Sequence, residues 1–113
     1  MKKVTAYIKS HRLSDVTLAL HQVEGMSGMS VSDGRGFGRG KAKGEKHSLK
    51  EDVVDYIPHV RIEIVCSDPL LEEIVSTIEK NAHTGLRGDG KVYVSDVESI
   101  VRISTGNRGE GAV

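Results

Sequence analysis

Residues 83–94, HTGLRGDGKVYV, place three glycines, an aspartate and a lysine between a helical pattern and a strand pattern. Glycine amides and nearby cations are groups that bind phosphate, and Arg87, Lys91 and Arg102 are cations in or near this stretch. It is not a Walker A motif, because it lacks that motif's spacing and runs from a helix into a strand. Taken alone, the stretch is consistent with a phosphate site or with an ordinary glycine-rich turn.

A second glycine-rich stretch, GRGFGRG at 34–40, precedes a long charged segment. Residues 38–55 show no sustained hydrophobic period, and we expect one loop over all 18 of them. Structureless loops longer than about 12–15 residues are uncommon in compact domains and usually carry function or disorder. The two glycine-rich stretches and this loop are therefore the candidate functional segments.

Hydrophobic periodicity predicts the elements that position these segments. In the first strand Val4, Ala6 and Ile8 share one face, and the first helix has apolar residues at helical spacing. We expect Ser14 and Asp68 to cap the two helices. Strands are expected over 2–9, 29–37, 56–66, 91–97 and 99–104, and helices over 13–24 and 67–82.

The order of these elements is strand–helix–strand, loop, strand–helix–strand. Two such halves with amphipathic helices predict an α+β fold, a ferredoxin-like βαβ-βαβ sandwich, in one domain over 1–113 with a polar tail at 105–113. Each strand buries one face, so both helices are expected on the same side of an antiparallel sheet. The other face then needs a cover, which predicts oligomerisation.

Composition limits the classes of function. Lys and Arg together number 16, as do Asp and Glu, so the formal net charge is zero, which argues against a general nucleic-acid binder. The single cysteine, Cys66, allows no internal disulfide and is expected to pack as a small apolar residue. No apolar run is long enough for a signal peptide or a membrane span. We therefore expect a soluble cytoplasmic protein without membrane insertion.

The two glycine-rich stretches occur in a fixed order with two further motifs. GFGR at 36–39 precedes the long loop, DYIPHVRIEIV at 55–65 follows it, TGLRGDGK at 84–91 forms the glycine turn, and RISTG at 102–106 lies near the end. In their order and in the length of the loop, these motifs resemble the PII signal-transduction family (nitrogen regulatory protein P-II) over essentially the whole chain. Several departures make the chain similar to a divergent, PII-like member.

The resemblance implies a cytoplasmic homotrimer that signals rather than catalyses. Adenine nucleotides (ADP, AMP or ATP, with or without Mg²⁺) would bind in clefts between subunits. The T-loop, residues 38–55, would dock onto a membrane transporter or a regulated enzyme. Arg102 would reach the phosphates from the neighbouring subunit. By position in the family's motifs, the nucleotide-binding residues would be Ser30, Gly36, Gly38, Arg39, Glu63, Gly88, Asp89, Gly90, Lys91 and Arg102.

Two departures from the family's pattern concern the second ligand. Gly40 stands where the family has a glutamine that helps hold magnesium and 2-oxoglutarate, and His59 stands where a lysine pairs with the 2-oxoglutarate carboxylate. A histidine, unlike a lysine, carries no fixed charge at pH 7, so we expect weak binding of 2-oxoglutarate. A smaller anion near Arg39, Gly40 and His59 is then the hypothesis, with bicarbonate as its identity.

Other departures concern the nucleotide and the T-loop. Ser104 replaces the second arginine of the family's R-I-R ending, which lets ADP or AMP compete with ATP, although Arg87 offers a compensating charge. Asp52 and Lys50 occupy the positions of a tyrosine and a serine that family members modify, so neither modification can occur there. Ser48 is a further hydroxyl in the loop, and nothing in the sequence supports its modification.

Other interpretations of the sequence stay open. One is an ordinary nitrogen-status regulator that senses ATP and 2-oxoglutarate. Another is a metal-responsive regulator linked to cation efflux, which would use His47 and His59 as ligands, although no metal site is expected. An enzyme is not expected either, because no nucleophile has an evident base beside it and no carboxylate pair is placed for acid–base catalysis.

Overall fold

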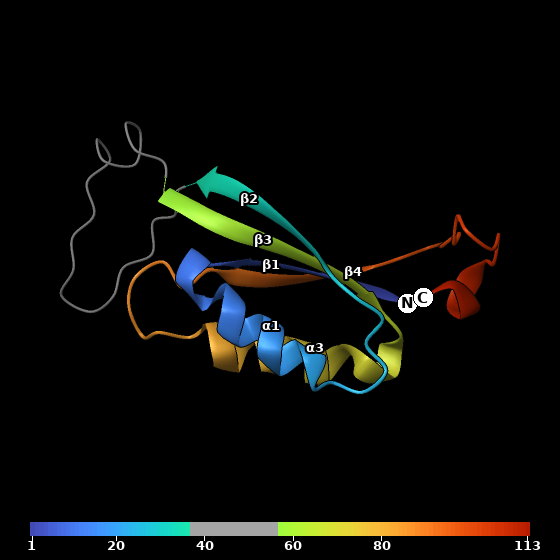
Figure 1. Ribbon diagram of the computed structural model, residues 1–113, viewed down its shortest axis with the longest axis horizontal. Coiled ribbons are helices and arrows are strands. Elements are labelled where there is room, and N and C mark those ends of the chain that lie inside the picture. Colours follow the sequence, from blue (N-terminus) through green and yellow to red (C-terminus); the bar gives the residue numbers. More distant parts are fainter. Residues whose placement is uncertain (37–56) are drawn as a thin grey trace.

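The computed structural model describes residues 1–36 and 57–113 of the chain (Figure 1). The T-loop expected at 38–55 lies outside the described residues. Seven residues considered above for binding or modification lie outside them as well: Gly38, Arg39, Gly40, His47, Ser48, Lys50 and Asp52.

The described chain forms one antiparallel sheet and two α-helices. The strand order is β2-β3-β1-β4, and every neighbouring pair is antiparallel. This is the ferredoxin-like βαβ-βαβ arrangement that the sequence predicts. In sequence order the elements are β1 (Lys2–Ile8), α1 (Leu13–His21), β2 (Ser30–Gly36), β3 (Ile57–Cys66), α3 (Leu71–Ala82) and β4 (Lys91–Asp96).

Both helices lie on the same side of the sheet, as expected (Figure 1). The alternation of side chains along β1 and β3 places Val4 and Ile62 on this side, where they are fully buried against Leu20 of α1 and Ile74 of α3 in one core cluster. Cys66, at the end of β3, is buried in the same cluster. Burial raises the pKa of its thiol, so it behaves as a packed apolar residue, as expected.

The opposite side of the sheet, called here the open face, has no helix of the described chain on it (Figure 1). Tyr7 of β1, His59 of β3 and Tyr93 of β4 lie on this face. The Tyr7 ring contacts the other two edge to face, with centroid separations of 5.1 Å to His59 and 6.0 Å to Tyr93. Tyr93 remains 53% exposed in the single chain. The open face is therefore an aromatic and polar surface available to other molecules.

The prediction that Ser14 and Asp68 cap the two helices is wrong. Ser14 lies inside the first turn of α1, which follows a 3₁₀ turn at Ser10–Arg12. Asp68 starts a second 3₁₀ turn, Asp68–Leu70, which leads into α3. Neither α-helix has a side-chain cap hydrogen bond. Each 3₁₀ turn supplies main-chain partners instead, because short turns of this kind commonly begin α-helices.

The prediction of a strand at 99–104 is also wrong, because no strand forms there. Val101 and Arg108 form one isolated bridge, and the Arg102 amide donates to the Asn107 carbonyl at 2.9 Å. Gly106 has a φ of +73°, so the chain reverses there before a ladder can extend. The expected tail at 105–113 is partly ordered, since it contains a 3₁₀ turn at Gly109–Ala112.

Candidate functional site

One carboxylate organises the glycine turn between α3 and β4. Asp89 accepts hydrogen bonds from the backbone amides of Thr84 and Gly85, at 2.9 and 3.0 Å, and from the Thr84 hydroxyl. The Lys9 ammonium lies 3.2 Å from this carboxylate and donates to the Thr84 hydroxyl oxygen at 3.0 Å. Asp89, expected among the nucleotide-binding residues, thus makes its contacts with the turn and with Lys9, and it holds the shape of the turn.

The same contacts decide the charge of Asp89. Burial raises the pKa of this carboxyl, but hydrogen bonds from Thr84, from the Gly85 amide and from Lys9 outweigh burial and hold the pKa well below its usual range. The His83 ring nitrogen Nδ1 lies 3.5 Å from the carboxylate. Asp89 is therefore ionised at neutral pH. An anionic ligand at this turn has to be bound by the backbone amides and by cations rather than by Asp89.

Gly90 sets the distance between the turn and the sheet. Its φ is +98°, and a Cβ at this position would lie 1.6 Å from the carbonyl oxygen of Tyr7. Only glycine fits, because a side chain would overlap the main chain of β1. Lys91 follows directly, pairs with Tyr7 in the sheet and is exposed. Close approach at Gly90 therefore fixes where the Lys91 side chain leaves the sheet.

His59 lies at the point where β3 begins, after the expected T-loop. A Cβ on Gly34 would come within 2.9 Å of its Nε2 atom, and a Cβ on Gly36 within 3.3 Å of its Cε1 atom. The imidazole thus occupies a slot over two glycines of β2, and Tyr7 contacts it edge to face. Of the three residues expected around a second ligand, His59 is the described one, while Arg39 and Gly40 lie outside the described residues.

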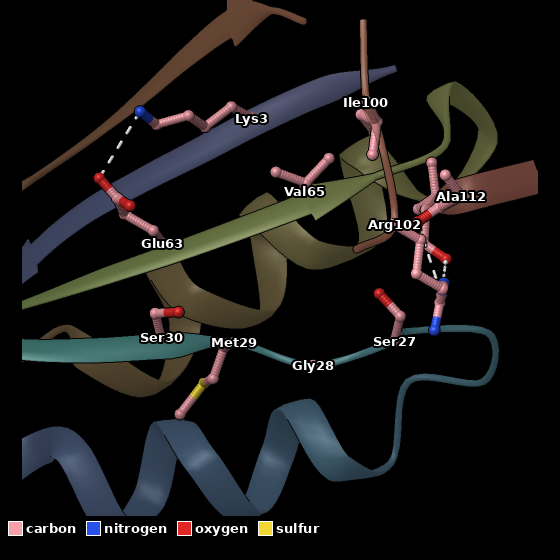
Figure 2. Close-up of a pocket in the computed structure, with 11 residues that line it drawn as sticks. Lys3, Ser27, Gly28, Met29, Ser30, Glu63, Val65, Ile100, Arg102 and Ala112 are labelled. Carbon is pink, nitrogen blue, oxygen red and sulfur yellow. Dashed lines mark hydrogen bonds and ion pairs between the residues drawn. The ribbon is translucent and has the colours of Figure 1, made fainter. Parts of the chain in front are cut away.

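A pocket of about 390 Å³ lies toward the opposite end of the sheet (Figure 2). Ser30 and Glu63 face each other across β2 and β3, and both line this pocket together with Arg102. Lys3 lies 3.6 Å from the Glu63 carboxylate, and Arg61 also pairs with Glu63. Two cations therefore offset the charge of Glu63. The other walls come from 27–29, Val65, Ile100, Ala112 and Val113.

Within one chain, the expected nucleotide-binding residues fall into two separate groups. The turn group lies at the end of the sheet where β2 ends and β3 begins, and the pocket group lies toward the other end (Figure 1). Lys91 and Ser30 are on opposite edge strands, three inter-strand spacings or about 14 Å apart across the sheet. The turn group is Gly88, Asp89, Gly90 and Lys91, and the pocket group is Ser30, Glu63 and Arg102.

Gly36 adds to this separation. It ends β2 at the same end of the sheet as the turn group, and it is six residues from Ser30 on one extended strand. Six residues of strand span about 20 Å. The structure therefore brings together the members of each group, but it does not bring both groups into one cleft of a single chain.

Sequence reasoning missed three residues that shape the site. Lys9 and Thr84 hold Asp89, and Tyr7 contacts both Gly90 and His59. Thr84 carries a detectable signal, since a hydroxyl residue just before a glycine turn commonly bonds within that turn. Lys9 carries no such signal, because it is 80 residues from Asp89 in the sequence.

Within residues 1–36 and 57–113, no group of three or more His, Cys, Asp or Glu side chains is arranged to hold a metal ion. His47, the proposed partner of His59 in a metal site, lies outside these residues. In the same described part of the chain, none of the helices has the length and apolar character needed to cross a bilayer.

Comparison with known proteins gives one consistent result. The family described as "Nitrogen regulatory protein P-II" matches residues 1–107. A protein of that name from Azospirillum brasilense is 46% identical over 113 residues, which cover 100% of both chains. The proteins named Nitrogen regulatory protein P-II from Rhodospirillum rubrum and Nitrogen regulatory protein P-II 1 from Escherichia coli K12 are 43% and 44% identical over the full length of both chains. The motifs, the ferredoxin-like fold and these matches agree, and the chain belongs to the P-II family of nitrogen regulatory proteins.

Proposed function

We propose that this chain is a signalling regulator that binds an adenine nucleotide in the clefts between the subunits of a cytoplasmic homotrimer. The nucleotide would change the T-loop, and the T-loop would control a partner protein. The observation that carries the proposal is the separation of the turn group from the pocket group. Each group has part of the chemistry for a nucleotide, and two neighbouring subunits are needed to bring the parts together.

The turn group supplies the phosphate side of the cleft. Gly88 and Gly90 provide backbone amides in a turn with positive φ, and Lys91 provides an exposed ammonium. Amides and cations together are the groups that bind phosphate oxygens. Asp89 is an anion in the same turn, but Lys9 and three hydrogen bonds from the turn occupy its carboxylate.

The pocket group supplies the other side of the cleft. The Ser30 hydroxyl and the Glu63 carboxylate lie on neighbouring strands and offer hydrogen bonds to the polar edge of a base or to a ribose. Val65 and Ile100 give the same pocket apolar walls, which suit a planar base. Arg102 adds a guanidinium, a group well matched to phosphate.

The open face supplies the contact between subunits. Its rings, Tyr7, His59 and Tyr93, form an aromatic row that no described helix covers. Burying such rings is favourable in protein association. The turn group lies at the β4 edge of the sheet and the pocket group lies toward the β2 edge. A closed ring of three chains can therefore place the turn group of one chain against the pocket group of the next.

The ligands and the partner follow from the sequence departures. Ser104 in place of a second arginine supports ADP or AMP as competitors of ATP. His59, held in its slot over Gly34 and Gly36, supports a loss of 2-oxoglutarate sensing. A response to bicarbonate near Arg39, Gly40 and His59 is the accompanying hypothesis. The partner would be a membrane transporter or a regulated enzyme that contacts the T-loop, and the protein would act by ligand-dependent conformation rather than by catalysis.

Mixed trimers test whether the cleft lies between subunits. Lys91→Ala and Arg102→Ala are each expected to weaken ADP binding in calorimetry by about tenfold to a hundredfold, since each removes a charge-assisted contact worth about 1.5–3 kcal/mol. When the two variants are unfolded together and reassembled, some clefts combine a wild-type Lys91 from one chain with a wild-type Arg102 from another. These clefts are expected to regain wild-type affinity.

The control is each variant reassembled alone, which should show no recovery. Absence of recovery in the mixture, with trimers verified by light scattering, would contradict a shared cleft, because a site within one chain always lacks one of the two side chains. Absence of nucleotide binding by the wild-type trimer would contradict the proposed function itself.

A second function is favoured by one observation, the names of the relatives. The Azospirillum brasilense and Escherichia coli proteins are both named nitrogen regulatory proteins. An ordinary nitrogen-status regulator would bind 2-oxoglutarate together with magnesium-ATP. Titration of 2-oxoglutarate into the trimer saturated with magnesium-ATP separates the two functions. Tight, synergistic binding supports the ordinary regulator, whereas weak or undetectable binding supports the loss of that sensing.

A further inference from the structure

The end of the chain folds back over the pocket. Residues Gly109–Ala112 form a 3₁₀ turn, and the Gly109 amide donates to the Ile100 carbonyl at 3.1 Å. The Ala112 side chain is only 7% exposed, and both Ala112 and Val113 line the same pocket as Ser30 and Glu63. The terminal segment, residues 109–113, is therefore packed into the pocket group rather than extended into solvent.

Arg102 is already engaged by this segment. One terminal nitrogen, Nη2, donates to a main-chain oxygen of Val113 at 3.0 Å and to that of Ala112 at 3.5 Å (Figure 2). These contacts are made to main-chain atoms, so they depend on the position of the segment and not on the identity of its side chains. A phosphate that approaches this guanidinium must therefore compete with the main-chain oxygens of Ala112 and Val113 for the Nη2 donor.

We propose that residues 109–113 form an autoinhibitory latch, which occupies Arg102 and part of the pocket until a nucleotide displaces it. The proposal rests on the proposed function, because it concerns the regulation of the same cleft. A nucleotide phosphate carries more negative charge and offers more acceptor oxygens than the two main-chain oxygens, so it forms the stronger set of charge-assisted hydrogen bonds with a guanidinium. At a sufficient concentration the nucleotide therefore displaces residues 109–113 from Arg102, and the stability of the latch determines that concentration.

The latch lowers the apparent affinity for nucleotide, because only chains in which residues 109–113 are displaced (the open form) can bind. When only a fraction of the chains is competent to bind, the apparent dissociation constant rises by the inverse of that fraction. The contacts that hold the latch closed are the two hydrogen bonds from Arg102, the Gly109–Ile100 hydrogen bond, an ion pair at 3.5 Å between the Met1 amino group and Glu110, and one buried methyl group. Contacts of this size correspond to about a threefold to tenfold excess of the closed form over the open form. Release of the latch should tighten binding by the same factor.

Two variants release the latch by different routes. Ala112→Gln places a larger neutral side chain in a buried position and should expel the segment without changing the charge of the pocket. Removal of residues 110–113 deletes the segment but keeps the Gly109 amide that bonds to Ile100. Gly111→Ala is the matched control, because a Cβ at Gly111 would meet no atom within 4 Å and should leave the latch closed.

Calorimetric titration with ADP and hydrogen exchange of residues 109–113 test the proposal on the intact trimer. We expect both released variants to bind ADP about threefold to tenfold more tightly than the wild type, while Gly111→Ala binds equally. We also expect faster exchange of the wild-type segment when ADP is added, because the displaced segment loses its contacts.

Two results overturn the latch while leaving the proposed function intact. The first is weaker ADP binding by both released variants, which would make the segment part of the binding site. The second is slower exchange of residues 109–113 with ADP, which would mean that the nucleotide closes the segment. If neither the wild type nor the released variants bind any adenine nucleotide, the proposed function and the latch both fail.

Discussion

Asp89 joins two parts of the chain that are 80 residues apart. Lys9, just after β1, and Thr84, just after α3, both bond to its carboxylate. The turn that leads into β4 is therefore tied to the end of β1 as well as to itself. Because these bonds are made to the ionised form, the pKa of Asp89 lies well below its usual range.

The lowered pKa of Asp89 predicts an acid-sensitive contribution to stability. Since the folded-state pKa is below the unfolded value of about 3.9, the contribution is complete above about pH 5 and is lost progressively as the pH falls through the folded-state pKa. Asp89→Asn should reduce the free energy of unfolding at pH 7 by about 2 kcal/mol. Urea unfolding at pH 7 and at pH 3 measures this difference, which should shrink at the lower pH.

Asp96→Asn is the control for Asp89→Asn. Asp96 pairs with Lys2 at the surface and is 78% exposed, so its loss should cost less than about 1 kcal/mol. An Asp89→Asn variant as stable at pH 7 as Asp96→Asn would show that the bonds of Asp89 do not organise the turn.

Gly90 predicts a steric effect at the residue scale. Gly90→Ala should lower the free energy of unfolding by about 3 kcal/mol or more, because its Cβ would lie 1.6 Å from the Tyr7 carbonyl oxygen. Gly85→Ala is the matched control. Gly85 also has a positive φ, +79°, but its Cβ would meet only the His83 ring at 3.8 Å. Thermal unfolding of the two variants distinguishes backbone overlap from positive φ alone, and equal losses would contradict the overlap.

At the scale of elements, the pairing of β2 with β3 creates the slot for His59. Gly34 is paired with His59, and Gly36 is two residues further along the same strand. The absence of side chains at both positions lets the imidazole lie over the strand. The two strands that flank the expected T-loop are thus connected by a side chain as well as by the ladder.

A double-mutant cycle tests this slot. Gly34→Ala should cost less than about 1 kcal/mol in the wild type, because the His59 ring is a side-chain end that can move, and it should shift the NMR signals of His59 and Tyr7. In a His59→Ala background the same change should be neutral or stabilising, since alanine is better than glycine in a strand. Equal effects in both backgrounds would show that the ring does not occupy the slot.

Much of the element pattern could be predicted from the sequence. Alternation at Val4, Ala6 and Ile8 marked the buried face of β1, because one face of a strand against helices must be apolar. The caps could not be predicted. Ser14 and Asp68 have the right chemistry, but Ser14 lies two residues after the N-cap position of α1 (Arg12) and Asp68 lies two residues before that of α3 (Leu70). Single-residue signals fail where the local backbone, and not the side chain, supplies the hydrogen bonds.

At the scale of the whole molecule, the open face predicts assembly. Tyr93→Asp places a charge in the aromatic row of this face and should convert the proposed trimer to smaller species in size-exclusion chromatography with light scattering. Leu18→Asp is the matched control, because Leu18 is 65% exposed on α1, in the helix layer on the other side of the sheet. The control should remain trimeric. Dissociation of both variants, or of neither, would contradict assembly through the open face.

The candidate site was only partly predictable for a reason that also belongs to this scale. The glycine turn and Lys91 were evident, because their chemistry lies within one short stretch. The pocket around Arg102 was not evident as a pocket, since its walls come from β1, residues 27–30, β3 and the end of the chain. The contact of Lys9 with Asp89 depends on the pairing of β1 with β4 and has no local signature.

The central position of β1 has a consequence for how the chain is made. β1 is the first element in the sequence, yet its two neighbours in the sheet are β3 and β4, which end at residues 66 and 96. During synthesis β1 must therefore wait, without a strand partner, until most of the chain has emerged. Non-local pairing of this kind slows folding and leaves the early strand exposed to aggregation. The turn held by Lys9 and Asp89 can close only after residue 89 has been made, and the pocket, whose walls include Ala112 and Val113, is completed later still.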